Sequence, residues 1–300
     1  MTLNNRLKYS PHVRGLRTLR SLIGVRPDKE GLRSSYGYVQ HILKPKSKSV
    51  LFASFPASGW NWTVDVLSFV LCKHYTGQYE VKYEETGKTL KQAERKPIRL
   101  FYPADARAQE SIFLPDVLPK CPTDHFYHTH GYYGESPLWG LESAKHVLIV
   151  RDFITALYSN FLKRKANYER FEDYLQKTNA VDRLVRFYNS WGAFCEKNPE
   201  QCFVLKYEDL KDDPAQYFEQ TARFILNAKI SSSIYQEAID YYSFDNQKKR
   251  ESLFARNETK HFHFKGQKSY KDLIDPKTYE SLVDTLENNL KYKFGYDLSK

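Results

Sequence analysis

The sequence predicts an α/β fold, a single domain with a mainly parallel central sheet flanked by helices. Short apolar runs alternate with longer segments of helical periodicity, which is typical of such sheets. The chain has 300 residues, of which 41% are hydrophobic, enough to bury a large core. No linker or internal repeat divides it. We therefore expect one domain at residues 46–300, preceded by a basic, irregular lead-in at residues 1–45.

The first part of the expected domain is a strand, a tight turn and a helix. Residues 49–54 (SVLFAS) form a short apolar run, which is typical of a buried strand. Residues 61–75 carry Val64, Leu67 and Leu71 at helical spacing, which predicts a helix packed on one face. The strand and the helix meet in a turn at residues 54–62.

The remaining elements follow the same alternation. Strands are expected at residues 125–130, 146–150 and 202–210, the last one running into a turn; helices are expected at residues 151–165, 181–195, 214–226 and 276–292. The last two helices open with a proline, which is tolerated at a helix start. Residues 76–124 are polar, then proline-rich, and show no sustained period. We expect them to form irregular binding loops.

Lys and Arg outnumber Asp and Glu by 46 to 36, giving a net charge of +10. This balance favours an anionic partner, which can be nucleic acid, a membrane surface, a polyanionic substrate or a phosphate-rich cofactor. The Arg-rich start of the chain makes a basic nucleic-acid or polyanion-binding module the main non-enzyme alternative. No recognised nucleic-acid motif or aromatic stacking platform supports it, so no nucleic acid is expected as a partner.

The sequence contains no apolar run long enough to cross a membrane and no apolar segment of a secretory signal peptide. Its cysteines, Cys72, Cys121, Cys195 and Cys202, show no CxxC spacing and do not describe a disulfide framework. A reducing compartment is the default for such a chain. We therefore predict a soluble, cytoplasmic protein. The sequence gives no basis for assigning an oligomeric state.

The turn at residues 54–62 has the layout of a phosphate-binding loop. Small residues at Ala57, Ser58 and Gly59 allow backbone N–H groups to approach an anion, and the helix starting near Asn61 adds its own N–H groups and dipole. The chain contains no GxxxxGK[ST] string, so a nucleotide kinase or ATPase of the usual P-loop type is disfavoured.

The segment SFPASGWNW (54–62) resembles the 5′-phosphosulfate loop of sulfotransferases that use 3′-phosphoadenosine 5′-phosphosulfate (PAPS), whose pattern is roughly T-Y-P-K-S-G-T-T-W. A second match is VLIVRDFITALYS. It supplies an Arg at the end of a strand, Arg151, and a Ser eight residues later, Ser159, as in the family's 3′-phosphate site. A guanidinium fork and a hydroxyl suit a phosphate dianion.

A third match is YHTHG, which places His130 where the family carries its general base. Residues two apart on a strand point to the same face, so His128 and His130 should project together. Zinc binding is a competing interpretation, because Cys121 and His125 lie in the same short segment. Structural zinc sites usually pair their ligands as CxxC or HxxxH, and we expect no metal here.

Two weaker matches complete the resemblance, which covers residues 49–272. KYEDLKDDP (206–214) resembles the family segment whose tyrosine lines the adenine site, here Tyr207. FKGQKSYK (264–271) resembles a degraded form of the loop that closes over the 3′-phosphate. The cofactor-binding residues that the resemblance implies are Ser58, Gly59, Trp60, Asn61, Trp62, Arg151, Ser159, Tyr207, Lys265 and Gly266.

The resemblance implies a sulfotransferase that moves a sulfuryl group from PAPS to a hydroxyl acceptor by in-line displacement, with His130 as base. The acceptor is a small molecule or a glycan. The family's phosphate-loop lysine is replaced by Ala57. His128, if protonated, or Lys265 would have to supply the missing charge. Otherwise the protein binds the nucleotide with weak or no turnover, an alternative that the sequence leaves open.

Overall fold

A computed structural model of the chain describes residues 48–79, 100–103, 114–134, 141, 143–243, 245–246 and 270–298. The expected lead-in at residues 1–45 lies outside the described residues, and so do Lys265 and Gly266.

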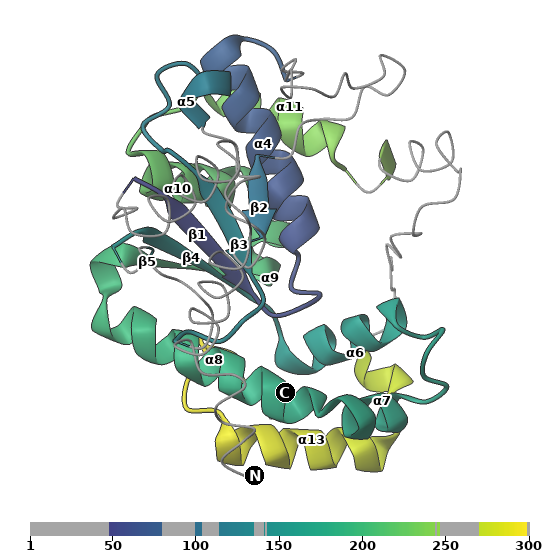
Figure 1. Ribbon diagram of the computed structural model, residues 1–300. Helices are drawn as coiled ribbons and strands as arrows, with labels where there is room; N and C mark the ends of the chain where they lie inside the picture. Colours follow the sequence, from purple (N-terminus) through teal and green to yellow (C-terminus); the bar gives the residue numbers. More distant parts are fainter. Residues whose placement is uncertain are drawn as a thin grey trace, which may run out of the picture.

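The centre of the molecule is a sheet of five strands in the order β2-β3-β1-β4-β5, and every pair of neighbours is parallel (Figure 1). The strands are β1 (Val50–Ser54), β2 (Phe101–Pro103), β3 (Phe126–Thr129), β4 (Lys145–Val150) and β5 (Cys202–Lys206). The predicted parallel α/β fold is thus confirmed.

The central position of β1 explains why four of its five residues are apolar. All five of its residues are buried, because it lies in the middle of the sheet with helices on both faces. Val50 and Phe52 face one hydrophobic cluster, and Leu51 and Ala53 face the other. The alternation of side chains along the strand therefore divides the core into two layers.

Helices cover both faces of the sheet (Figure 1). On one face lie α4 (Trp60–Thr76), α10 (Pro214–Leu226) and α11 (Ser232–Tyr241), with the short helices α5 (Leu114–Val117) and α9 (Tyr207–Asp212). On the other face lie α6 (Phe153–Lys163), α7 (Phe171–Thr178), α8 (Ala180–Lys197) and α13 (Pro276–Asn289). In the described part of the chain, no helix is long and apolar enough to cross a membrane.

Three of these helices begin where the sequence offers a capping aspartate. Asp152 accepts a hydrogen bond from the Thr155 backbone N–H at 2.8 Å at the start of α6. Asp213 and Asp275 do the same for α10 and α13, each directly before a proline. Such caps satisfy backbone donors that a helix start leaves without partners.

The segment expected to be irregular, residues 76–124, contains two elements that the sequence did not indicate. β2 adds an edge strand beside β3, and α5 follows it. Strand β2 has three residues, too few to show a period, and it is defined by pairing with β3. Helices α7 and α11 were also missed. They are short, and each packs against longer helices.

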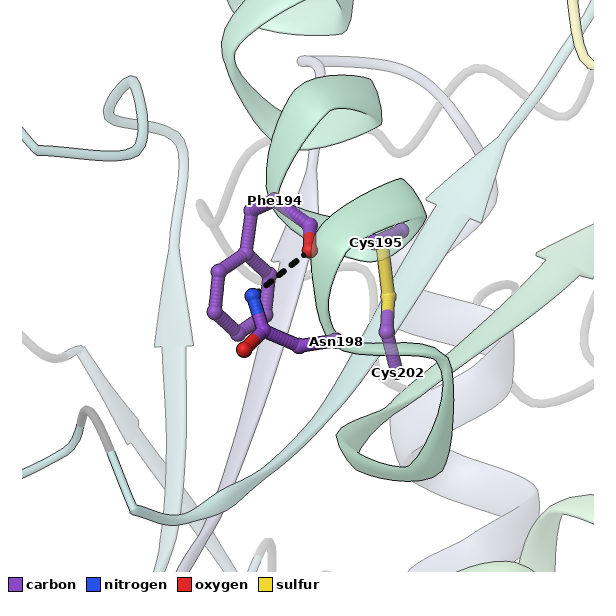
Figure 2. Close-up of a disulfide and its surroundings, with 4 residues drawn as sticks. All are labelled: Phe194, Cys195, Asn198 and Cys202. Atoms are coloured by element: carbon purple, nitrogen blue, oxygen red, sulfur yellow. Dashed lines mark hydrogen bonds between the residues drawn. A yellow bond between two sulfur atoms is a disulfide. The ribbon is translucent and has the colours of Figure 1, made fainter.

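The cysteines require a correction. Cys195, near the end of α8, and Cys202, the first residue of β5, form a disulfide with their Cα atoms 5.2 Å apart (Figure 2). The 3₁₀ turn η2 (Pro199–Gln201) between them folds the chain back, and the Asn198 side-chain amide donates to the Phe194 carbonyl at 2.9 Å. Cys72 and Cys121 are free and buried. The expectation of uniformly reduced cysteines is therefore wrong for one pair.

Candidate active site

The predicted site residues gather at the carboxyl end of the sheet. Ser54 ends β1, His130 follows β3, Arg151 follows β4 and Tyr207 follows β5. Because all the strands are parallel, these ends share one edge, the usual place for a ligand site in an open α/β sheet.

The loop between β1 and α4 turns sharply at Ala57 and Gly59, which have φ angles of 72° and 92°. A Cβ on Gly59 would lie 2.3 Å from the Tyr207 ring, so both the backbone angle and the close approach require glycine. No described side chain caps α4, which begins at Trp60. The backbone donors at this helix start are suited to a phosphate.

Ser58 faces the interior of the protein. Its side chain is fully buried, and its backbone N–H donates to the Phe55 carbonyl at 3.2 Å. Its hydroxyl lies 3.4 Å from the hydroxyl of Tyr188. Ser58 therefore shapes the loop from inside, while Asn61 and Trp62 are only partly buried at the start of α4.

The side chain of His130 is exposed, and a hydrogen bond to the last residue of β1 orients it. Its Nδ1 lies 2.6 Å from the Ser54 carbonyl oxygen. A carbonyl only accepts, so Nδ1 carries the proton in this contact and Nε2 is the basic nitrogen. The His128 and His130 rings lie edge to face with centroids 4.3 Å apart, which confirms that the two side chains project together.

His128 is buried between Ser54 and Trp60, which flank the loop that joins β1 to α4. Its Nε2 lies 3.0 Å from the Ser54 hydroxyl, and its ring stacks on Trp60. Burial, and secondarily the nearby His130, lowers the pKa of His128 well below its ordinary value. At neutral pH His128 is therefore uncharged.

Arg151 reaches the phosphate loop at the position where the family pattern has lysine. Its Nη1 donates to the Ala57 carbonyl at 2.7 Å, and its guanidinium lies 4.5 Å from the centroid of the Tyr207 ring. Its Nε is buried without a hydrogen-bond partner in the described part of the chain.

Ser159 lies on α6, and its hydroxyl donates to the Tyr270 hydroxyl at 3.2 Å. The sequence reasoning missed Lys163, which follows Ser159 by one helical turn and so shares its face. Burial, and secondarily the charge of Arg151, lowers the pKa of Lys163. Two cations thus lie near each other beside Ser159. The i,i+4 spacing from Ser159 was the available signal.

The aromatic residues of the site form a continuous group. Trp62 packs edge-on against Tyr207 and Phe218, with ring centroids 6.4 and 5.6 Å away. Trp62 also packs against the core cluster on the α4 face of the sheet, so it connects Tyr207 to the core. Tyr207 is partly buried between Gly59 and Arg151.

The zinc interpretation finds no support in the geometry. Among the residues that the structure describes, no three His, Cys, Asp or Glu side chains are grouped so that they could hold a metal ion. Burial raises the pKa of the Cys121 thiol to about 11, so without a metal ion the thiol is protonated at neutral pH.

Residues 47–294 match the sulfotransferase domain family, and the chain belongs to this family. The match spans the sheet, the loop between β1 and α4, Arg151 after β4, and helix α6, which carries Ser159. No curated protein sequence matches the chain.

Solved structures agree on the fold. A retinol dehydratase in complex with androsterone and the inactive cofactor PAP has a TM-score of 0.56 and 16% identity, over 88% of each chain. Mouse sulfotransferase SULT7A1 complexed with PAP has a TM-score of 0.59 and 14% identity, over 86% of this chain and 91% of that one. A putative steroid sulphotransferase from Arabidopsis thaliana has a TM-score of 0.52 and 15% identity, over 87% and 85% of the two chains.

Proposed function

We propose that the protein transfers a sulfuryl group from PAPS to the hydroxyl group of an acceptor. The acceptor oxygen attacks sulfur, its proton passes to Nε2 of His130, and the bond from sulfur to the 5′-phosphate oxygen breaks. The product nucleotide, 3′-phosphoadenosine 5′-phosphate (PAP), leaves with the bonding electrons. The step requires a base for the acceptor and donors for the leaving phosphate.

The observation that carries this proposal is the contact between His130 Nδ1 and the Ser54 carbonyl at 2.6 Å. Ser54 ends β1 and immediately precedes the phosphate loop. The contact therefore fixes both the tautomer of the base and its place beside the phosphate loop. General bases of this kind need such a fixed geometry as well as a suitable pKa.

The remaining residues are assigned to the nucleotide. Backbone groups of residues 57–62 hold the 5′-phosphate, Tyr207 and Trp62 flank the adenine, and Arg151 with Ser159 binds the 3′-phosphate. Lys265 and Gly266 lie outside the described residues, and we assign them to the 3′-phosphate as well.

We retain Lys265, which lies outside the described residues, as the candidate for the charge that Ala57 lacks. His128 is neutral at neutral pH because burial lowers its pKa, so we assign it the positioning of Ser54 and His130. The Arg151 guanidinium touches the loop at the Ala57 carbonyl, but we assign it to the 3′-phosphate.

The acceptor class is a small molecule or a glycan with a free hydroxyl. Two retinol dehydratase structures of similar fold contain androsterone and retinol, which makes lipid-like alcohols the first group to test. The compartment stays open to experiment: the sequence favoured the cytoplasm, whereas a disulfide such as Cys195–Cys202 is typical of oxidising compartments.

The test combines PAP binding with transfer from labelled PAPS to sterol-like alcohols, phenols and sugars. His130→Ala should abolish transfer and leave PAP affinity within about twofold, because His130 is assigned to the acceptor rather than to the nucleotide. His74→Ala is the matched control, since His74 lies in the last turn of α4, away from the site. Loss of PAP binding in His130→Ala would contradict the base assignment.

The second candidate is a nucleotide-binding protein without turnover. The absence of lysine at Ala57 and the neutral state of His128 favour it, because both leave the leaving group with less positive charge. Tight binding of PAP with no sulfation of any acceptor, including acceptors tested at high enzyme concentration, would establish this alternative.

A further inference from the structure

Tyr188 of α8 is a fully buried tyrosine that the proposed reaction does not use. Its ring packs against Phe153 of α6, Phe55 of the phosphate loop and Phe294 near the C-terminus, with ring centroids 4.9, 6.2 and 5.8 Å away. These neighbours fix the ring from several sides. The position of its hydroxyl is therefore set by the core.

Tyr188 contacts both regions that carry the proposed phosphate sites. Its hydroxyl is 3.4 Å from the Ser58 hydroxyl, a long hydrogen bond, and its ring packs on Phe153, which follows Arg151 by two residues. Burial raises the pKa of Tyr188 far above its ordinary value, so the group stays protonated and neutral. A neutral hydroxyl can donate to one neighbour and accept from another.

We propose that Tyr188 is a positioning residue that holds the phosphate loop, through its hydroxyl, and the segment after β4, through its ring, at the separation that the two phosphates of PAP require. This inference rests on the proposed function. Ser58 belongs to the 5′-phosphate loop and Arg151 to the 3′-phosphate site, and they are 93 residues apart in the sequence. Tyr188 contacts both regions from the interior of the protein, where it is fully buried.

The hydrogen bond between Arg151 and Ala57 also joins the loop to the end of β4, but it involves a group that is needed for the ligand. Arg151 Nη1 donates to the Ala57 carbonyl at 2.7 Å, but that guanidinium must also serve the phosphate. The Tyr188 hydroxyl lies in the protein interior and does not compete with the ligand. Tyr188 therefore keeps the loop and the segment after β4 in the same relative position whether or not the nucleotide is bound.

The test is Tyr188→Phe in the full chain, which keeps the ring and removes the hydroxyl. Removing it leaves the buried Ser58 hydroxyl without its partner, and such a loss corresponds to about tenfold in an equilibrium constant. PAP affinity should therefore fall about tenfold, whereas the affinity for adenosine 5′-phosphate, which engages only one phosphate site, should change less than about twofold. Calorimetry with both nucleotides measures the ratio.

The ratio distinguishes positioning from general loosening of the fold. Equal weakening of the two nucleotides, or no change for PAP, would overturn the inference while leaving the proposed function intact. If the unmodified protein binds neither nucleotide, the proposed function fails and the inference fails with it. Tyr235→Phe is the matched control: Tyr235 is equally buried, in α11, and its hydroxyl has no hydrogen-bond partner in the described part of the chain.

Ser58→Ala provides an independent route should Tyr188→Phe fail to fold. It removes the other partner of the same contact and should lower the PAP to adenosine 5′-phosphate affinity ratio to a similar extent. In the double variant, the loss should not exceed that of either single change, because residues in one contact act as a unit. Fully additive losses would contradict the link through Ser58.

Discussion

The indole ring of Trp60 lies flat on the imidazole of His128, with ring centroids 3.7 Å apart and 10° between the planes. Trp60 is the first residue of α4, and His128 lies on β3. The stack covers one face of the buried histidine, and the Ser54 hydroxyl holds its Nε2 at 3.0 Å. The neutral state of His128 thus depends on its neighbours.

Trp60→Ala should raise the pKa of His128 toward its ordinary value, because removing the indole lets water reach the imidazole and reduces the burial that disfavours its charged form. NMR titration of the imidazole resonances measures the change. Trp60→Phe keeps a stacked ring and should leave the pKa low. An unchanged pKa in Trp60→Ala would show that the rest of the fold, rather than the indole, keeps His128 neutral.

Ala57→Lys should increase the rate of sulfuryl transfer by about 10²-fold, the size of effect seen when one well-placed donor to developing charge is added or removed. Ala57 already has a Cβ at a φ of 72°, so lysine adds no new backbone strain. Steady-state kinetics with PAPS and the best acceptor measure the gain. Ala57→Gln matches the length without the charge, and an equal gain in that variant would refute the electrostatic explanation.

Arg151→Lys should weaken PAP binding by about 10–100-fold, because an ammonium cannot keep both the Ala57 hydrogen bond and the contact with the Tyr207 ring while it binds phosphate. Calorimetric titration measures the affinity. The control is Arg223→Lys, which changes an exposed arginine paired with Glu219 on α10. Unaltered PAP affinity in Arg151→Lys would place the 3′-phosphate elsewhere.

The disulfide makes a prediction about thiol number. Protein unfolded without reductant should show two reactive thiols, Cys72 and Cys121, and four after reduction. Cys195→Ser should lower the free energy of unfolding by about 2–3 kcal/mol, the loop-closure value for so short a loop. Denaturant titration measures this loss. Four thiols in the unreduced protein would contradict the bond.

Because His146 is buried, we expect the protein to lose stability in acid. Burial lowers its pKa to about 4, which an interaction with the Ala144 backbone only partly offsets. The unfolded chain has the higher pKa and binds a proton first, so stability falls as the pH drops from about 6.5 toward 4, by up to about 3 kcal/mol. His146→Phe should remove this slope in denaturant titrations at several pH values. A slope that persists in the variant would assign it to other groups.

Local sequence determined much of the fold and the outline of the site. The run at residues 49–54 is mainly apolar because β1 is buried on both faces. The turn at Gly59 can be predicted from the neighbouring residues alone, without knowledge of any distant contact. The spacing of Arg151 and Ser159 follows from a strand end and one helix. Strand β2, in contrast, is too short for a period and depends on pairing with β3.

By itself, the sequence determined the parallel α/β fold, the tight turn at residues 54–62 and the same-face placement of His128 and His130, because each depends on residues close together in the chain. Only the tertiary structure decided the neutral state of His128, the reach of Arg151 to Ala57, the disulfide, and the contact of Tyr188 with Ser58. Each of these joins elements far apart in sequence or depends on burial, and neither spacing nor composition reports how separate elements pack.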